Sequence, residues 1–193
     1  MDDPRDRVRK PREPHLPPVP GRVRPVRPAQ HHRPRQQRQH RGPDRRVRGL
    51  RRRPDEPGAE PPATADSQCA STEGPEKAVN GSTSGGNSDK WCSTGGTKFL
   101  RIDLGAVHRI QSVTVHHAAA GGEDPAWNTR DFDLQASADG STWTTVAQVR
   151  GSTAGVSSHP MSVDGRYLLV KILTPTQTTD PAARLYEVEV YGT

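Results

Sequence analysis

Apolar and polar residues alternate along several short segments in the second part of the chain. Two of these segments, residues 166–173 and 184–191, lie near the end of the sequence with a polar Thr- and Pro-rich loop between them. A period of two indicates a β-strand with one buried face, because successive side chains of a strand point to opposite sides. The same pattern predicts further strands over residues 99–104, 110–116, 132–136 and 143–149.

The turns between these segments carry Gly and Asp, and no window has the spacing of a long amphipathic helix. Asp139 and Gly140 supply the positive φ that a tight hairpin needs. Short strands joined by such turns predict an all-β fold, a sandwich or jelly roll. In this fold the alternation places Trp91 and Trp143 inside the core.

Composition divides the chain into two unlike parts. Residues 1–66 contain 18 of the 28 Lys and Arg residues but 9 of the 22 Asp and Glu residues, a net charge of +9, which leaves −3 for residues 67–193. The first part also holds 14 of the 19 prolines and no Phe, Trp or Tyr. A segment of this composition cannot build a core, so residues 1–66 are expected to be disordered and residues 67–193 to form one domain.

Three interpretations of residues 1–66 remain open. The segment is a nucleic-acid or polyanion arm, a Pro-stiffened linker kept solvated by its charge, or the product of a start codon assigned too early or a frame error. The last interpretation rests on the lack of Ser, Asn, Ile and Cys and on the dominance of residues with GC-rich codons. The first thirty residues contain no apolar signal-peptide region, and no run is long enough to cross a membrane.

The domain contains two cysteines, Cys69 and Cys92. An even count in a small, loop-rich domain favours a disulfide over two buried thiols, and with it an exported ancestry. A disulfide across this separation of 23 residues contributes about 3 kcal/mol to the free energy of unfolding in the chain-entropy model.

Five segments in register resemble one family. They are KAVNGS with DKW, KFLRIDLGAVHRIQSVTV, FDLQASADGSTWTTV, GRYLLVKI and YEVEVYG. Together they resemble the discoidin, or coagulation factor V/VIII type C, domain over residues 67–193, and within it the family 32 carbohydrate-binding modules of bacterial glycoside hydrolases. The resemblance implies an eight-stranded antiparallel jelly-roll sandwich of the galactose-binding-like kind, an extracellular or cell-surface location, and ligand-binding loops at one end.

The resemblance also implies a structural Ca²⁺ ion. The family's ligand positions fall on the Lys77 carbonyl, Asn80, Ser82, Asp89, the Tyr186 carbonyl and Glu187. Calcium accepts such a mixture of carboxylate, amide and carbonyl oxygens. This chain departs from the family at Asn80, where Asp is more usual, and in a longer loop before Asp89. The alternative to a calcium site is a loop that is held by hydrogen bonds alone.

The long loop over residues 116–130 is the expected ligand site. Sugars are bound by a flat apolar ring together with polar groups that pair with hydroxyls. Trp127 is the stacking candidate, although it could instead fold back on the sandwich edge, and Arg130 could instead pair with a neighbouring Asp. The candidate polar partners are His116, His117, Glu123, Asp124, Asn128 and Arg130, with Gln177 and Asp180 as weaker candidates from the loop at 174–181.

Two function hypotheses follow, and neither is catalytic. No GxSxG, HExxH or P-loop motif occurs, and a small sandwich offers no deep cleft for paired carboxylates. The first hypothesis is a monomeric module that binds a glycan or polysaccharide for a secreted glycoside hydrolase, without nucleic acid or membrane insertion. The second is a polyanion-binding or surface-adhesion protein whose basic arm supplies the charge attraction.

Overall fold

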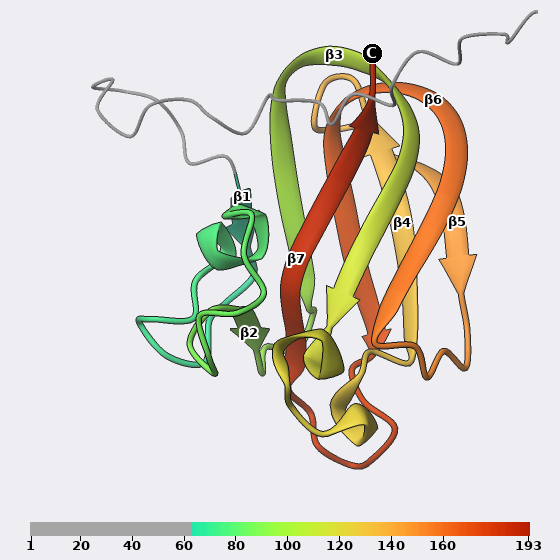
Figure 1. Cartoon of the computed structure of the whole chain (residues 1–193). Helices are drawn as coiled ribbons and strands as arrows, with labels where there is room; N and C mark the ends of the chain where they lie inside the picture. The colour runs from blue at the N-terminus through green and yellow to red at the C-terminus, as the bar shows by residue number, and fades with distance from the viewer. Residues whose placement is uncertain (1–62) are drawn as a thin grey trace, which may run out of the picture. The chain divides into compact units, whose positions relative to one another are not determined.

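Figure 1 shows the computed structural model of the chain, which describes residues 63–193. The prediction of disorder for the Arg- and Pro-rich segment concerns residues that lie almost entirely outside this range. The described elements are, in chain order, β1 (Ala63–Ala65), η2 (Pro75–Val79), β2 (Trp91–Ser93), β3 (Phe99–His117), η3 (Ala118–Gly121), η4 (Pro125–Trp127), β4 (Asp131–Ser137), β5 (Thr144–Val149), β6 (Val156–Thr174) and β7 (Ala183–Gly192).

Two long strands connect the layers of an antiparallel all-β sandwich. The first half of β3 pairs with the second half of β6, and β1, β4 and β5 extend this layer on either side. The second half of β3 pairs with the first half of β6 and with β7, which in turn pairs with β2. The sheet order is β2-β7-β3-β6-β4-β5, with β1 on β3, so the seven described strands include two that serve both layers.

The bend in β3 explains why two separate strands were expected there. The pairing register shifts between Asp103 and His108, and Gly105 lies between them at a φ of 83°. Glycine adopts this left-handed conformation without strain from a Cβ. Figure 1 shows β3 and β6 arching over at the end of the sandwich where β7 terminates.

The core lies between the two layers and contains the residues that the alternation pointed inward. Most strand residues of the core come from both halves of β3 and from β4, β6 and β7, and each of these is at most 6% exposed: Leu100, Ile102, Leu104, Ile110, Val113, Val115, Phe132, Leu134, Leu168, Val170, Ile172, Leu185, Val188 and Val190. Trp91 is fully buried, as predicted. Trp143 is only half-buried, because it lies just before the edge strand β5, so its assignment to the core was wrong.

Two features of the strands differ from the pattern-based expectation. Residues 156–165, the first half of β6, form a strand that the alternation did not single out, and they contain Pro160 and many polar side chains. The outward side chains of this segment face solvent, where an antiparallel sheet accommodates polar residues. In addition, β1 pairs with β3 through Ala63, so the sheet includes residues that precede position 67. No helix within residues 63–193 is long and apolar enough to cross a membrane.

Candidate functional site

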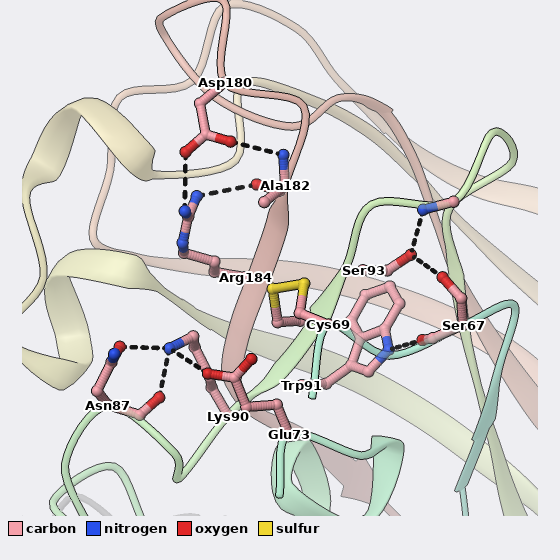
Figure 2. The surroundings of a disulfide bond; sticks show 12 residues. Ser67, Cys69, Glu73, Asn87, Lys90, Trp91, Ser93, Asp180, Ala182 and Arg184 are labelled. Carbon is pink, nitrogen blue, oxygen red and sulfur yellow. Dashed lines mark hydrogen bonds and ion pairs between the residues drawn. A yellow bond between two sulfur atoms is a disulfide. The ribbon is translucent and has the colours of Figure 1, made fainter. Parts of the chain in front are cut away.

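A disulfide closes the loop that leads into β2. Cys69 and Cys92 are bonded and lie 23 residues apart, with their Cα atoms separated by 5.3 Å. The backbone N–H of Cys69 donates to the carbonyl of Cys92 at 2.9 Å, and the indole N–H of Trp91 donates to the Ser67 carbonyl at 3.0 Å (Figure 2). The pairing expected from the cysteine count is therefore present, and it encloses residues 70–91.

The enclosed loop gathers oxygen-bearing side chains against the last strand. Asn80 donates through Nδ2 to Asp89 Oδ1 at 2.6 Å, and the Gly85 N–H donates to Asp89 Oδ2 at 3.0 Å. The Gly81 N–H donates to Glu187 Oε2 at 3.0 Å. Asp89 and Glu187 are both buried although each carries a carboxylate. The loop and β7, 106 residues apart at this contact, thus meet at the Glu187 carboxylate, while Asp89 organises the loop itself.

The Ser82 hydroxyl completes this group. It forms a hydrogen bond with Asp89, which together with the bonds from Asn80 and Gly85 holds the pKa of the Asp89 carboxyl below its usual value despite burial. Carboxylate, amide and hydroxyl oxygens are the ligand types that calcium takes, but here Asn80 turns its Nδ2 to Asp89 while its Oδ1 accepts from the Ser82 N–H at 2.8 Å. The structure therefore brings together Asn80, Ser82 and Asp89, and it places Glu187 against Gly81 of the same loop. Lys77 lies three residues before Asn80 in η2, and Tyr186 directly precedes Glu187 in β7, so the two residues of the expected carbonyls adjoin this group in sequence.

A second cluster beside the disulfide is built from buried charges. The side chain of Lys90 is 3% exposed, and its Nζ lies 3.1 Å from Glu73 Oε1 and 2.8 Å from Glu123 Oε1. It also donates to the backbone carbonyl and the side-chain oxygen of Asn87 (Figure 2). A buried lysine needs such partners to remain charged. Lys90 consequently ties the disulfide-closed loop to the loop that follows β3.

Glu123 extends this cluster to the opposite side. Its Oε2 lies 3.2 Å from Arg184 Nε, and its Oε1 accepts a hydrogen bond from the Tyr186 hydroxyl at 2.6 Å. Burial, and then the Glu123 carboxylate, raises the pKa of the Tyr186 hydroxyl. A Cβ at Gly121 would stand 1.9 Å from the Tyr186 ring, so only glycine fits there. Glu123 was expected to bind sugar, yet the structure uses it as an internal ion-pair partner.

Three other candidates of the loop belong to its framework. His117 is fully buried, and its Nε2 lies 3.0 Å from the Ser157 hydroxyl; burial lowers its pKa to about 4. Asn128 is 1% exposed and bridges the Ala119 N–H and the Thr153 carbonyl. His116 is part of β3, with Nε2 3.5 Å from Glu189 Oε2. His117 and Asn128 lie inside the protein, where a sugar cannot reach them without rearrangement.

The remaining candidates are accessible. Asp124 is exposed and caps η4 by accepting a hydrogen bond from the Ala126 N–H at 2.8 Å. Trp127 is half-buried, and Arg130 is exposed, with Nε 4.0 Å from Asp131 Oδ2. The Gln177 side chain donates to the carbonyls of Asn128 and Ser152, at 3.1 and 2.7 Å. Figure 1 shows η4 and the loop after β6 together at the end opposite the arches of β3 and β6.

Arg184 is the residue of this end that the sequence pattern did not single out. Its guanidinium carbon lies 4.6 Å from the centre of the Trp127 ring, and Nη2 donates to Asp180 Oδ2 at 2.8 Å. Lys90 was likewise missed, although it occurs in the quoted DKW segment. Their positions in sequence carry no signal, because both roles depend on partners from other loops.

The Cys69, Glu73 and Cys92 group does not form a metal site. Within residues 63–193 it is the one group of three or more His, Cys, Asp or Glu residues whose ligand atoms all lie within 4.8 Å of one another. Both of its sulfur atoms are already joined in the disulfide, and the ligand of zinc and similar metals is the free thiolate.

Comparison with known proteins identifies relatives for most of the described chain. The F5/8 type C domain family matches residues 62–188. The family 32 carbohydrate-binding module of EndoD from Streptococcus pneumoniae is 28% identical, with a TM-score of 0.60 over 68% of this chain and 96% of that one. A search of curated protein sequences finds no match to this chain.

Two further solved structures share the fold at lower identity. One is chitosan-binding module 1 from the chitosanase/glucanase of Paenibacillus sp. IK-5, at 23% identity and a TM-score of 0.54, covering 67% of this chain and 93% of that one. The other is the family 32 module of NanJ from C. perfringens in complex with galactose, at 15% identity and a TM-score of 0.55, covering 67% and 91%.

Proposed function

Since the chain belongs to the F5/8 type C domain family, we propose that its sandwich is a non-catalytic module that binds glycans through the loops around Trp127. The observation that carries the proposal is a half-buried indole in a loop whose neighbouring polar residues are exposed, at one end of the fold. Asp124 and Arg130 lie three residues to either side of Trp127, and both are exposed. A ring for the C–H face of a sugar and charged groups for its hydroxyls are thus available together.

The solved relatives support this ligand class. The module in the C. perfringens structure holds galactose, and the Paenibacillus module binds chitosan. We propose a glycan as the ligand here as well, with the weak affinity of a shallow site, about 4 to 6 kcal/mol or the high micromolar to millimolar range. The Paenibacillus module derives from a chitosanase/glucanase. By analogy we propose that this module is an appendage of a secreted glycoside hydrolase and acts as a monomer outside the cell.

We further propose that calcium stabilises the module. The ion would be held by the carboxylates of Asp89 and Glu187, the side-chain oxygens of Asn80 and Ser82, and the carbonyls of Lys77 and Tyr186. When bound, the ion would supply positive charge to two buried carboxylates. Asn80 turns its Nδ2 toward Asp89 and its Oδ1 accepts from the Ser82 N–H, so for Asn80 to act as a ligand its amide would have to rotate and give up both bonds. The ion would link the loop before β2 to β7, so the proposed role of this site is structural.

A glycan array with the full chain tests the ligand class. Trp127→Ala should abolish binding to every glycan that the wild-type chain retains, whereas the matched control Trp143→Ala, at the β4–β5 hairpin, should preserve binding. Each array is run at low and moderate ionic strength. Binding that survives Trp127→Ala and collapses with salt would instead support the polyanion hypothesis, in which the basic segment dominates.

A further inference from the structure

Arg184 has a protein acceptor for each of its three side-chain nitrogens. Nε lies 3.2 Å from Glu123 Oε2, Nη2 donates to Asp180 Oδ2 at 2.8 Å, and Nη1 donates to the Ala182 carbonyl at 3.1 Å. The side chain is 13% exposed. Its guanidinium is therefore committed to the protein and is poorly placed to pair with a ligand.

The guanidinium covers one face of the Trp127 indole. The distance of 4.6 Å from its central carbon to the ring centre is within the range of a cation–π contact. Trp127 itself lies at the end of η4, a single turn of three residues. An element of this length does not fix a large side chain by its own hydrogen bonds, so the orientation of the indole depends on what packs against it.

The acceptors of Arg184 are fixed from other parts of the fold. Glu123 is held by Lys90, which lies in the disulfide-closed loop, and by the hydroxyl of Tyr186 in β7. Asp180 accepts a second hydrogen bond from the Ala182 N–H at 2.9 Å. The plane of the guanidinium is thus set by Glu123, four residues before Trp127, and by the loop of Asp180 and Ala182, which is remote from Trp127 in sequence. A lysine could not replace it, since an ammonium group lacks a planar fork.

We infer that Arg184 is a positioning residue that holds the Trp127 indole with one face covered and the other available. This inference rests on the proposed glycan site and names how that site is shaped. A sugar ring then stacks on one side of Trp127 only, and Arg184 contributes by fixing the ring rather than by touching the ligand. Glu123 and Asp180 act one step further away, by orienting Arg184.

Acrylamide quenching of tryptophan fluorescence tests the hold on the ring without any ligand. In a Trp143→Phe background the other tryptophan, Trp91, is fully buried, so quenching reports on Trp127. Arg184→Lys should raise the quenching constant about twofold, because the second face of the indole becomes accessible. Arg150→Lys is the matched control: Arg150 pairs with Asp133 at 2.7 Å, is half exposed, and should leave quenching unchanged. Equal quenching in wild type and Arg184→Lys would overturn the inference.

Sugar affinity supplies the second readout, measured by NMR titration with galactose, fucose and chitosan oligosaccharide. Arg184→Lys should raise the Kd of whichever sugar binds by about three- to tenfold, the range of a cation–π contact. The melting temperature of the variant should stay within a few degrees of that of the wild type. If Trp127→Ala has no effect on these sugars, the proposed function fails, and quenching alone still decides the role of Arg184. If Trp127→Ala abolishes binding while Arg184→Lys retains full affinity, only the inference on Arg184 is refuted.

Discussion

The Lys90 ammonium lies 2.8 Å from a carboxylate oxygen of Glu123, and their side chains are 3% and 9% exposed. This pair joins the loop before β2 to the loop after β3, with Glu73 as a second partner of Lys90 and Arg184 as a second partner of Glu123. Buried ion pairs are costly to break, because the remaining charge loses its partner without regaining water.

Glu123→Gln should therefore lower the free energy of unfolding substantially, by about 3 kcal/mol. The substitution keeps the shape of the side chain but removes the charge that faces Lys90 and Arg184. Urea denaturation of the two proteins at neutral pH measures the difference. Asp164→Asn is a suitable control, because the Arg109–Asp164 pair is exposed and its loss should cost less than about 1 kcal/mol. Similar small effects for both variants would contradict a structural role for the buried pair.

Calcium binding should raise the melting temperature of the wild-type chain, and a chelator should reverse the rise. At a calcium concentration one hundred times the Kd, the added stability is about 2.7 kcal/mol. Glu187→Gln should abolish the chelator effect, because it removes a buried carboxylate from the proposed site. Glu189→Gln, two residues further along β7, should retain it. A chelator effect that persists in Glu187→Gln would exclude Glu187 as a ligand.

The disulfide should support the same loop. Cys69→Ala/Cys92→Ala should lower the free energy of unfolding by about 3 kcal/mol, because the reduced chain has more conformations to lose on folding. Since the bond encloses Lys77, Asn80, Ser82 and Asp89, the variant should also bind calcium more weakly in isothermal titration. Intact mass under non-reducing conditions verifies the bond in the wild-type chain. Unchanged calcium affinity in the double variant would show that the loop is ordered without it.

Stability should fall as the pH decreases from about 6.5 to about 4 because of His117. Burial lowers the pKa of this imidazole from 6.5 to about 4, so within that window the unfolded chain binds a proton that the folded chain does not. The contribution of neutral His117 to stability is complete above pH 6.5, the pKa in the unfolded chain. Up to about 3 kcal/mol of it is lost as the pH falls to about 4, the pKa in the folded chain. His117→Gln should flatten the dependence of unfolding free energy on pH in this window. An identical pH slope in the variant would assign the effect to other groups.

Several parts of the fold followed from local patterns. Alternation with a period of two identified the buried faces of β4, β7 and both halves of β3, because a strand with one buried face requires it. It missed the first half of β6, whose outward positions are polar and which contains Pro160. It also placed Trp143 in the core, where alternation alone cannot tell an edge strand from a central one.

The loop around Trp127 could be located from the sequence, but its internal roles could not. Its length, polarity and single tryptophan marked it as a candidate site. Nothing local distinguishes Glu123 and Asn128, which hold the loop together, from Asp124 and Arg130, which face solvent.

The sequence by itself determined the all-β class, the face of each main strand that enters the core, and the cysteine pair available to form a disulfide. These properties depend on residue type and on spacing along one strand. Only the tertiary structure decided that Lys90, Glu123 and Arg184 meet, and that Arg184 covers one face of Trp127. Such contacts depend on strand order and on the bends of β3 and β6, which bring together side chains that no local periodicity relates.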